Sequence, residues 1–150
     1  MKKSLKSIVA MIVVLSFLAC EKENSESKIS YYNDDESHNM GQNCMNCHVQ
    51  GGEGEYLFSI AGTVYDSSLV STYPNATVKL FAGSNGTGEL KYTIQVDALG
   101  NFYSTELINF DNGLYASVEG SLQTKNMITV LNSGQCNSCH GVSVDKIWTK

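Results

Sequence analysis

The chain has 150 residues, a formal net charge of −5 at pH 7 and no arginine. Nucleic acids and anionic lipid surfaces are bound by clustered basic side chains, so this composition argues against both as partners. The chain contains only five cysteines and three histidines, few enough for the surroundings of each to be considered individually.

Residues 1–20 are predicted to be an export signal. Three lysines within the first six residues precede an apolar stretch, 8–18, that is too short for a membrane span. The signal ends in Phe17-Leu18-Ala19-Cys20, which resembles the lipobox of bacterial lipoproteins, where the cysteine becomes the lipidated N-terminus. We expect an exported protein held in the bacterial cell envelope by a lipid on Cys20, with plain secretion as the alternative.

Residues 21–37 are predicted to be an acidic, flexible tether. The segment contains Asp34, Asp35 and Glu36 in succession and has too few apolar side chains to offset the entropy of ordering. An acidic run after a lipidated cysteine resembles the surface-export signal of Bacteroidetes lipoproteins, and a plain solvated linker is the alternative. Both a surface-facing and a periplasmic orientation at the outer membrane therefore stay open.

The pattern C-x-x-C-H occurs twice. It lies at 44–48, in a first loop expected over 38–55, and at 136–140, in a second loop and tail expected over 132–150. In this pattern the two thiols can add to the vinyl groups of one haem, and the adjacent histidine supplies an axial nitrogen to its iron. The sequence therefore predicts two covalently bound haem c groups. The residues are the thioether cysteines Cys44, Cys47, Cys136 and Cys139 and the proximal ligands His48 and His140.

A single C-x-x-C also serves in zinc binding and in disulfide exchange, and both stay as alternatives. Haem is favoured because both copies are followed by histidine, and because the two copies account for four of the five cysteines. Glycines at 51, 52 and 54 exclude a long helix after the first copy. A small all-helical cytochrome c domain is therefore not expected.

Residues 56–131 are predicted to form a β-sandwich. Apolar and polar side chains alternate with a period of two over several short segments, as in half-buried strands. Turn-forming residues separate the segments, for example at 97–100 and 111–113. Six strands are expected, at about 58–64, 76–80, 92–96, 102–103, 114–118 and 127–131.

Parts of this region resemble the carboxypeptidase-regulatory-like, transthyretin-like β-sandwich. The resemblance covers about 58–120 and rests on Ile60-Ala61-Gly62-Thr63-Val64-Tyr65, on 76–80, on Asp97 to Gly100-Asn101-Phe102-Tyr103 and on Gly113-Leu114-Tyr115. It implies a mainly β, transthyretin-like or Ig-like sandwich flanked by two haem loops. The chain after its signal is also similar to small exported multihaem c-type proteins with this arrangement. That similarity implies that residues 38–41 and 126–127 belong to the haem sites.

Six-coordinate haem needs a second axial ligand, for which the sequence offers few candidates. They are His38, Met40, Met45 and Met127. Met45 is discounted because it lies inside the loop that the thioethers close. An extended chain of ten residues spans about 33 Å, so His38 could serve either haem. Met127 falls in a predicted strand, where a methionine more often packs in a core, but the resemblance favours it. We predict His38 and Met127 as the distal ligands.

These features predict an electron carrier rather than an enzyme: a dihaem cytochrome that exchanges electrons with redox partner proteins of the cell envelope. The alternatives are a haem sensor or enzyme with an open iron position, and a surface binding module whose cysteines hold zinc or disulfides. We further expect the two motifs to meet at one end of the sandwich. Six antiparallel strands would return the chain to the end where it entered.

Overall fold

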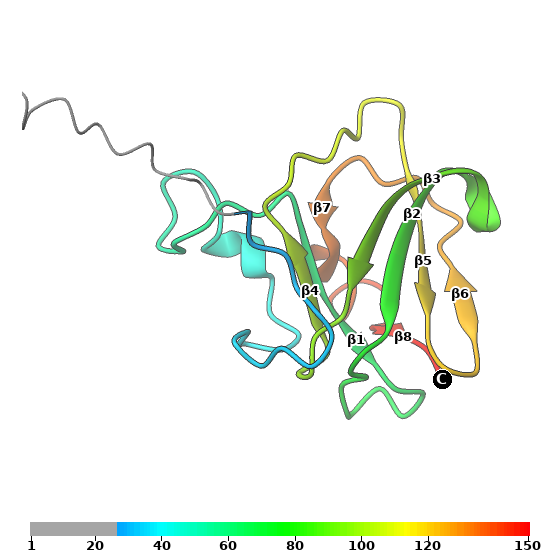
Figure 1. Ribbon diagram of the computed structural model, residues 1–150, viewed down its shortest axis with the longest axis horizontal. Coiled ribbons are helices and arrows are strands. Elements are labelled where there is room, and N and C mark those ends of the chain that lie inside the picture. The colour runs from blue at the N-terminus through cyan, green and yellow to red at the C-terminus, as the bar shows by residue number, and fades with distance from the viewer. Residues whose placement is uncertain (1–26) are drawn as a thin grey trace, which may run out of the picture.

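The computed structural model describes residues 27–150 (Figure 1). The export signal, the lipidation site Cys20 and the first part of the expected tether lie outside the described residues. Within 27–150 the chain is mainly β, with two sheets and three short 3₁₀ turns. The strands are β1 (Ile60–Tyr65), β2 (Thr77–Gly83), β3 (Thr87–Gln95), β4 (Asn101–Ser104), β5 (Tyr115–Glu119), β6 (Thr124–Asn126), β7 (Gly134–Gln135) and β8 (Ile147–Trp148). The turns are η1 (Cys44–Asn46), η2 (Ser84–Gly86) and η3 (Cys136–Ser138).

The first sheet is built around β1. Its order is β4-β1-β7, and β8 also pairs with β1. The β1–β4 pair is antiparallel, with Gly62 opposite Phe102, whereas β7 and β8 both run parallel to β1. Segments from the middle and the end of the chain therefore all meet on one strand.

The second sheet has the order β3-β2-β5-β6 and is antiparallel throughout. Val78 on β2 lies opposite Ile94 on β3 and Val118 on β5, so the three branched side chains form one row across the sheet. All three are buried. The alternation of apolar and polar side chains in these strands arises because successive side chains point to the buried row and to the solvent face in turn.

The hydrophobic core lies between the two sheets, as in a β-sandwich. Ile60, Val64 and Phe102 from the first sheet belong to one cluster with Val78 and Leu80 from the second, and each is at most 4% exposed. Burying one side chain of this size contributes about 1.5–3 kcal/mol. This cluster holds β1, and with it every segment that pairs with β1, against the second sheet.

The turn at 97–100 forms as its sequence predicted. The buried Asp97 carboxylate accepts hydrogen bonds from the backbone N–H of Leu99 at 2.9 Å and of Asn101 at 2.8 Å. Gly100 has φ +85°, a conformation that other L residues rarely adopt. The turn leads directly into β4, which pairs with β1.

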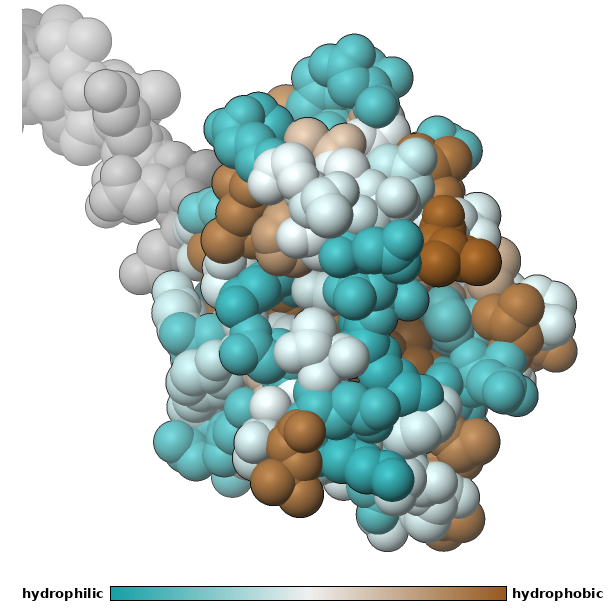
Figure 2. Space-filling view, turned by 90° about the vertical axis from the view of Figure 1, so that its right-hand side faces the viewer, coloured by the Kyte–Doolittle hydropathy of each residue, from teal (hydrophilic) through white to brown (hydrophobic). Residues whose placement is uncertain are grey.

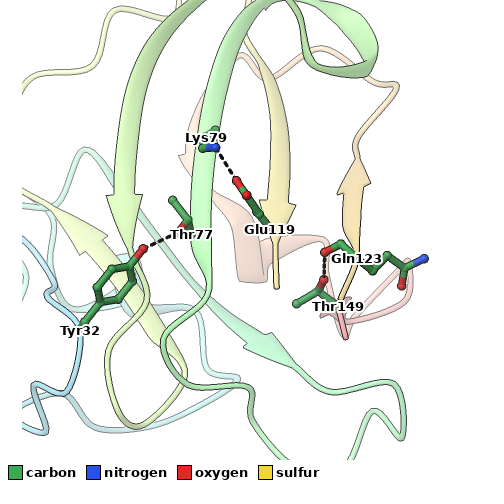
Figure 3. A network of polar contacts seen from close by, with 6 residues as sticks. All are labelled: Tyr32, Thr77, Lys79, Glu119, Gln123 and Thr149. Atoms are coloured by element: carbon green, nitrogen blue, oxygen red, sulfur yellow. Dashed lines mark hydrogen bonds and ion pairs between the residues drawn. The ribbon is translucent and has the colours of Figure 1, made fainter. Parts of the chain in front are cut away.

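The expectation of a flexible tether is wrong for residues 28–37. Ile29 bridges to Ser104 of β4, and the buried Ser30 donates from Oγ to the carbonyl of Gln95 at 2.6 Å. Figure 3 shows the hydroxyl of Tyr32 directed at Thr77 of β2. Contacts of polar side chains and backbone, rather than apolar burial, order this segment along the edge of the sandwich.

The expected sixth strand, 127–131, is also wrong. The strand that follows β5 is β6, which ends at Asn126, and residues 127–130 are irregular; Leu131 makes only an isolated bridge to Leu114. Ile128 is 76% exposed, whereas Met127 and Leu131 are half-buried and Leu131 packs against the core, so only part of this apolar stretch lies at the surface. On the face that carries β6, Figure 2 shows hydrophobic residues as patches separated by hydrophilic ones.

The expected boundary at 131/132 does not separate the sandwich from the second loop. Residues 132–150 contribute β7 and β8 to the first sheet. Thr149 is buried and donates from Oγ1 to the carbonyl of Gln123 at 2.7 Å, which fixes the end of the chain beside β6 (Figure 3). Between residues 27 and 150 there is no helix long and apolar enough to cross a membrane.

Candidate haem sites

The two C-x-x-C-H motifs have the same local fold. In the first, the N–H groups of Cys47 and His48 both donate to the carbonyl of Cys44, at 3.2 and 3.0 Å. In the second, the N–H groups of the corresponding cysteine and histidine both donate to the carbonyl of Cys136, at 3.3 and 3.0 Å. Each motif is thus a single 3₁₀ turn that brings two thiols and an imidazole together. The four motif cysteines are free thiols.

The imidazole of each motif histidine is held through Nδ1. This atom of His48 lies 2.9 Å from the carbonyl of Tyr56, and that of His140 lies 2.6 Å from the carbonyl of Asp145. A carbonyl can only accept, so Nδ1 is the protonated nitrogen and Nε2 keeps its lone pair. A hydrogen bond from Nδ1 to a carbonyl fixes the tautomer and the orientation of a metal-binding histidine. Both rings are prepared to bind a metal ion through Nε2.

The first motif opens on a cavity of about 840 Å³ beside β4. Its walls include Cys44, Cys47 and His48 and, across from them, His38 and Tyr103. In Figure 1 this motif is the cyan turn beside β4. The volume lies within the usual range of about 300–1,000 Å³ for small-molecule and cofactor sites.

His38 and His48 face one another in this cavity. Their ring centres are 6.2 Å apart, with 40° between the ring planes. A metal–imidazole bond is about 2.0 Å and places the ring centre about 3 Å from the metal, so two imidazoles on opposite sides of one ion have centres roughly 6 Å apart. The spacing fits two axial ligands of one iron. The far side of His48 stacks on Phe58 at 4.1 Å, and Phe58 stacks on Tyr103 at 4.9 Å.

The second motif opens on a separate cavity of about 620 Å³ that reaches between the sheets. Its walls include Cys136, Cys139 and His140, the core residue Phe102, and Met127. Ile147 and Trp148 of β8 close another side. A methionine thioether and a histidine therefore share this cavity, a ligand pair that haem iron accepts.

The structure divides the predicted distal ligands between the two sites. His38 belongs to the first cavity and Met127 to the second, a division that chain length alone did not decide. Met45, which was discounted from the sequence, is not among the residues that line either cavity. Met40 is 46% exposed and also lies outside both cavity walls.

The two cavities differ in charge. The first is lined by Glu36, Glu53 and Glu55 with one cation, Lys28. The second is lined by Lys125 and Lys146 with one anion, Asp145. Lys125 lies over the ring of Trp148, and the ammonium of Lys146 lies 4.0 Å from the ring centre of Tyr65, so aromatic rings hold both cations at the second site.

The two motifs lie side by side on β1, although Cys44 and Cys136 are 92 residues apart in the sequence. Burial, and after it the nearby thiol of Cys44, raises the pKa of the Cys136 thiol to about 12. A Cβ atom at Gly62 of β1 would lie 3.0 Å from the Cβ of Cys136, so this glycine makes room for the second motif. Both turns contact β1, as the expected meeting of the motifs requires, while two neighbouring haems at one end of the sandwich stay a prediction. The reason for the meeting is not the expected strand count: β7 runs parallel to β1 and places Cys136 beside it.

Several residues of the sites were not found from the sequence. The carbonyls of Tyr56 and Asp145 carry no sequence signal, because every residue has a carbonyl. Phe58 and Tyr103 had been assigned only to strands. Among residues 27–150, no three side chains of histidine, cysteine, aspartate or glutamate converge as ligands of one metal ion.

Comparison of the chain with family profiles, with curated proteins and with solved structures gave no match.

Proposed function

We propose that the protein is a dihaem c-type cytochrome that carries electrons in the cell envelope. The observation that carries this proposal is the repetition of one arrangement. Each C-x-x-C-H turn opens on its own cavity, and its histidine Nδ1 is bound to a backbone carbonyl, so that Nε2 is left for iron. Disulfide exchange would not require a histidine oriented in this way, and a zinc site would require at least three converging ligand side chains, which residues 27–150 do not bring together.

The chain's own residues would hold the two haems as follows. At each motif the two cysteines form the thioether bonds and the histidine supplies one axial nitrogen. His38 supplies the second ligand of the first haem, and Met127 that of the second. Bound haem would supply reversible one-electron chemistry between ferric and ferrous iron. The protein would orient the ligands and surround each iron with a different environment.

The two sites are expected to have different reduction potentials. Two histidine ligands and a surplus of carboxylates around the first site favour the ferric state, which lowers its potential. A methionine ligand and two lysines around the second site favour the ferrous state, which raises its potential. Electrons would therefore move from the first site to the second. Redox proteins of the envelope would be the partners, and the lipid on Cys20 would hold the carrier at the membrane.

We also propose that the sandwich belongs to the transthyretin-like, carboxypeptidase-regulatory-like type. The support is the Asp97–Gly100 turn, in which the carboxylate binds two backbone N–H groups and glycine takes a positive φ. In this proposal the sandwich is a scaffold that brings two haem loops together, since the fold alone does not specify a chemistry.

The test is the absorption spectrum and mass of the protein produced in a host that matures c-type cytochromes. We expect two haems per chain, retained after denaturation, and the sharp reduced bands of low-spin haem. A haem-free protein that contains zinc or disulfides would overturn the proposal and favour a surface binding module.

A second candidate function rests on the second site. The rings of His38 and His48 are 6.2 Å apart at the first cavity, whereas Met127 follows the end of β6 in an irregular segment. If Met127 leaves the iron, that site could bind a small ligand, as a sensor or an enzyme does. Carbon monoxide binding to the reduced protein at half of the haem would favour this function over simple electron transfer.

A further inference from the structure

Asn137 is the one buried residue of the second motif. It lies between the two cysteines and is 4% exposed, whereas Ser138 and Cys139 after it are exposed and Cys136 before it is half-buried. Nothing in the C-x-x-C-H pattern requires an amide at this position. A buried amide is retained only where its polar atoms find partners, so its hydrogen bonds indicate what it does.

The amide of Asn137 bonds in two directions. On β1, its Oδ1 accepts from the N–H of Thr63 at 3.2 Å, and its Nδ2 donates to Thr63 Oγ1 at 3.1 Å. The same Nδ2 lies 2.9 Å from the carbonyl of Gln42, two residues before Cys44. One side chain thus binds the second motif, the strand between the motifs and the backbone of the first motif.

Thr63 extends this connection. Its hydroxyl accepts from the N–H of Gly41 at 2.9 Å and donates to Oδ1 of Asn101 at 2.7 Å. Asn101 in turn donates from Nδ2 to the carbonyl of His38, at 3.3 Å. The network therefore runs from the C-x-x-C loop of the second motif to the backbone of the proposed distal ligand of the first haem.

We propose that Asn137 is a positioning residue that fixes the two haem loops relative to one another and thereby sets the interaction between the two haems. This inference rests on the proposed function. The electronic and Coulombic interaction of two redox centres falls with their separation and depends on their orientation. Loops without a direct tie could shift independently on β1, whereas the Asn137–Gln42 bond holds the second loop against the first.

The variant that tests this is Asn137→Asp. It keeps an oxygen for the N–H of Thr63 but replaces the donor to the Gln42 carbonyl by a second oxygen, which repels it. The matched control is Asn75→Asp. The side chain of Asn75 also binds the N-terminal segment to the sandwich. Its Oδ1 accepts from the N–H of Asn33 at 2.9 Å and its Nδ2 donates to Oδ1 of Asn33 at 3.0 Å, but it contacts neither motif. The control adds the same charge and removes the same kind of donor.

Three measurements are made on the haem-loaded proteins: haems per chain by mass, spin–spin interaction of the two ferric irons by electron paramagnetic resonance, and hydrogen exchange at Thr63 and Gly41. We expect two haems in every protein. The spin–spin interaction should fall by at least half, and exchange at Gly41 should accelerate, in Asn137→Asp but not in Asn75→Asp.

An interaction of native strength in Asn137→Asp would overturn the proposal, as would two non-interacting haems in the unaltered protein. A protein without haem would instead show that the proposed function is wrong, and the haem count makes that failure visible separately. If Asn137→Asp does not fold, Asn137→Ala is the second variant. It removes the bonds to Thr63 and to the Gln42 carbonyl without placing a charge in the loop. A native interaction in Asn137→Ala would overturn the proposal equally.

Discussion

At the scale of single residues, the two proposed sites depend on how each imidazole is held. The sequence identifies His48 and His140 by their place in the motifs, but their function depends on the bond from Nδ1 to a backbone carbonyl. His38 has no motif of its own. Its assignment comes from the 6.2 Å between its ring and that of His48.

Replacing His38 by alanine should change the ligation of the first haem without releasing it. The two thioethers and His48 would remain, so the haem stays attached while the sixth position of its iron opens. We expect a high-spin fraction from about half of the haem, measured by absorption and electron paramagnetic resonance. Met40→Ala is the control, since Met40 lies outside both cavities and its loss should leave the spectrum low-spin. An unaltered spectrum in His38→Ala would assign another ligand.

Tyr103 should make the folded protein sensitive to alkali. Burial and, after it, the carboxylates of Asp34, Asp97 and Glu36 raise the pKa of Tyr103 to about 12. Because the folded pKa lies above the ordinary value of about 10, the stabilisation is complete below pH 10 and is lost as the pH rises towards 12.

Tyr103→Phe should therefore lose less free energy of unfolding over this window than the unaltered protein. The difference should be on the order of 1 kcal/mol, because solvent screens a partly exposed group. Urea unfolding at successive pH values between about 9 and 12 measures it. Parallel curves for the two proteins would show that the Tyr103 pKa is not raised.

At the scale of elements, each 3₁₀ turn should hold its haem independently. Replacing Cys44 and Cys47 by serine removes both thioether bonds of the first haem and leaves the second motif intact. Mass spectrometry should find one haem instead of two. The reciprocal change at Cys136 and Cys139 is the control and should spare the first haem. Loss of both haems from either variant would mean that the sites assemble together.

The strand β7 should position the second motif through its glycine. A Cβ atom at Gly134 would lie 2.0 Å from the carbonyl oxygen of Ser59, so β7 pairs with β1 only if this residue has no side chain. Gly134→Ala should cost about 1–3 kcal/mol of stability and disturb the spectrum of the second haem.

Gly51→Ala serves as the control for this prediction. It has no neighbour within 4 Å of its Cβ position and carries only the cost of its positive φ. It should leave the spectrum of the second haem unchanged. Denaturation measures the stability of each variant, and near-infrared absorption measures the spectrum. Equal effects of the two substitutions on that spectrum would contradict the role of β7.

The elements differ in how well the sequence predicts them. The strands β2, β3 and β5 follow from alternation, because one face of each packs on the core and the other meets solvent. The strands β7 and β8 have two residues each, too few for any period to be seen. The stretch 127–131 is apolar in sequence but forms no strand, and its exposed Ile128 alternates with nothing that a sheet would bury. The segment 28–37 has a polar sequence that suggests disorder, yet the backbone carbonyls of Gln95 and Tyr103 hold it.

At the scale of the whole molecule, the sandwich has an acidic site beside β4 and a basic site that reaches between the sheets. Glu53→Gln together with Glu55→Gln removes two negative charges from the first site. Its reduction potential should rise by tens of millivolts, since removing negative charge favours the ferrous state.

The potential of the second site should change less under the same substitutions, because the two cavities are separate. A spectroelectrochemical titration that resolves the two haems measures both values. Glu89→Gln is the control, because Glu89 lines neither cavity and pairs with Lys91 on β3. If the reduction potential of the second haem changed more than that of the first, the assignment of the two potentials to the two sites would be wrong.

The pairing of β7 with β1 also bears on the order in which the protein matures. It joins parts of the chain that are far apart in sequence, and such contacts form late and slowly in folding. In the folded chain Cys136 lies half-buried at the wall of the second cavity. If the protein carries two haems, as we propose, its thiols would be more accessible to the enzymes that attach haem before β7 pairs with β1 than afterwards. The relative rates of folding and haem attachment would then determine how completely the second motif is modified.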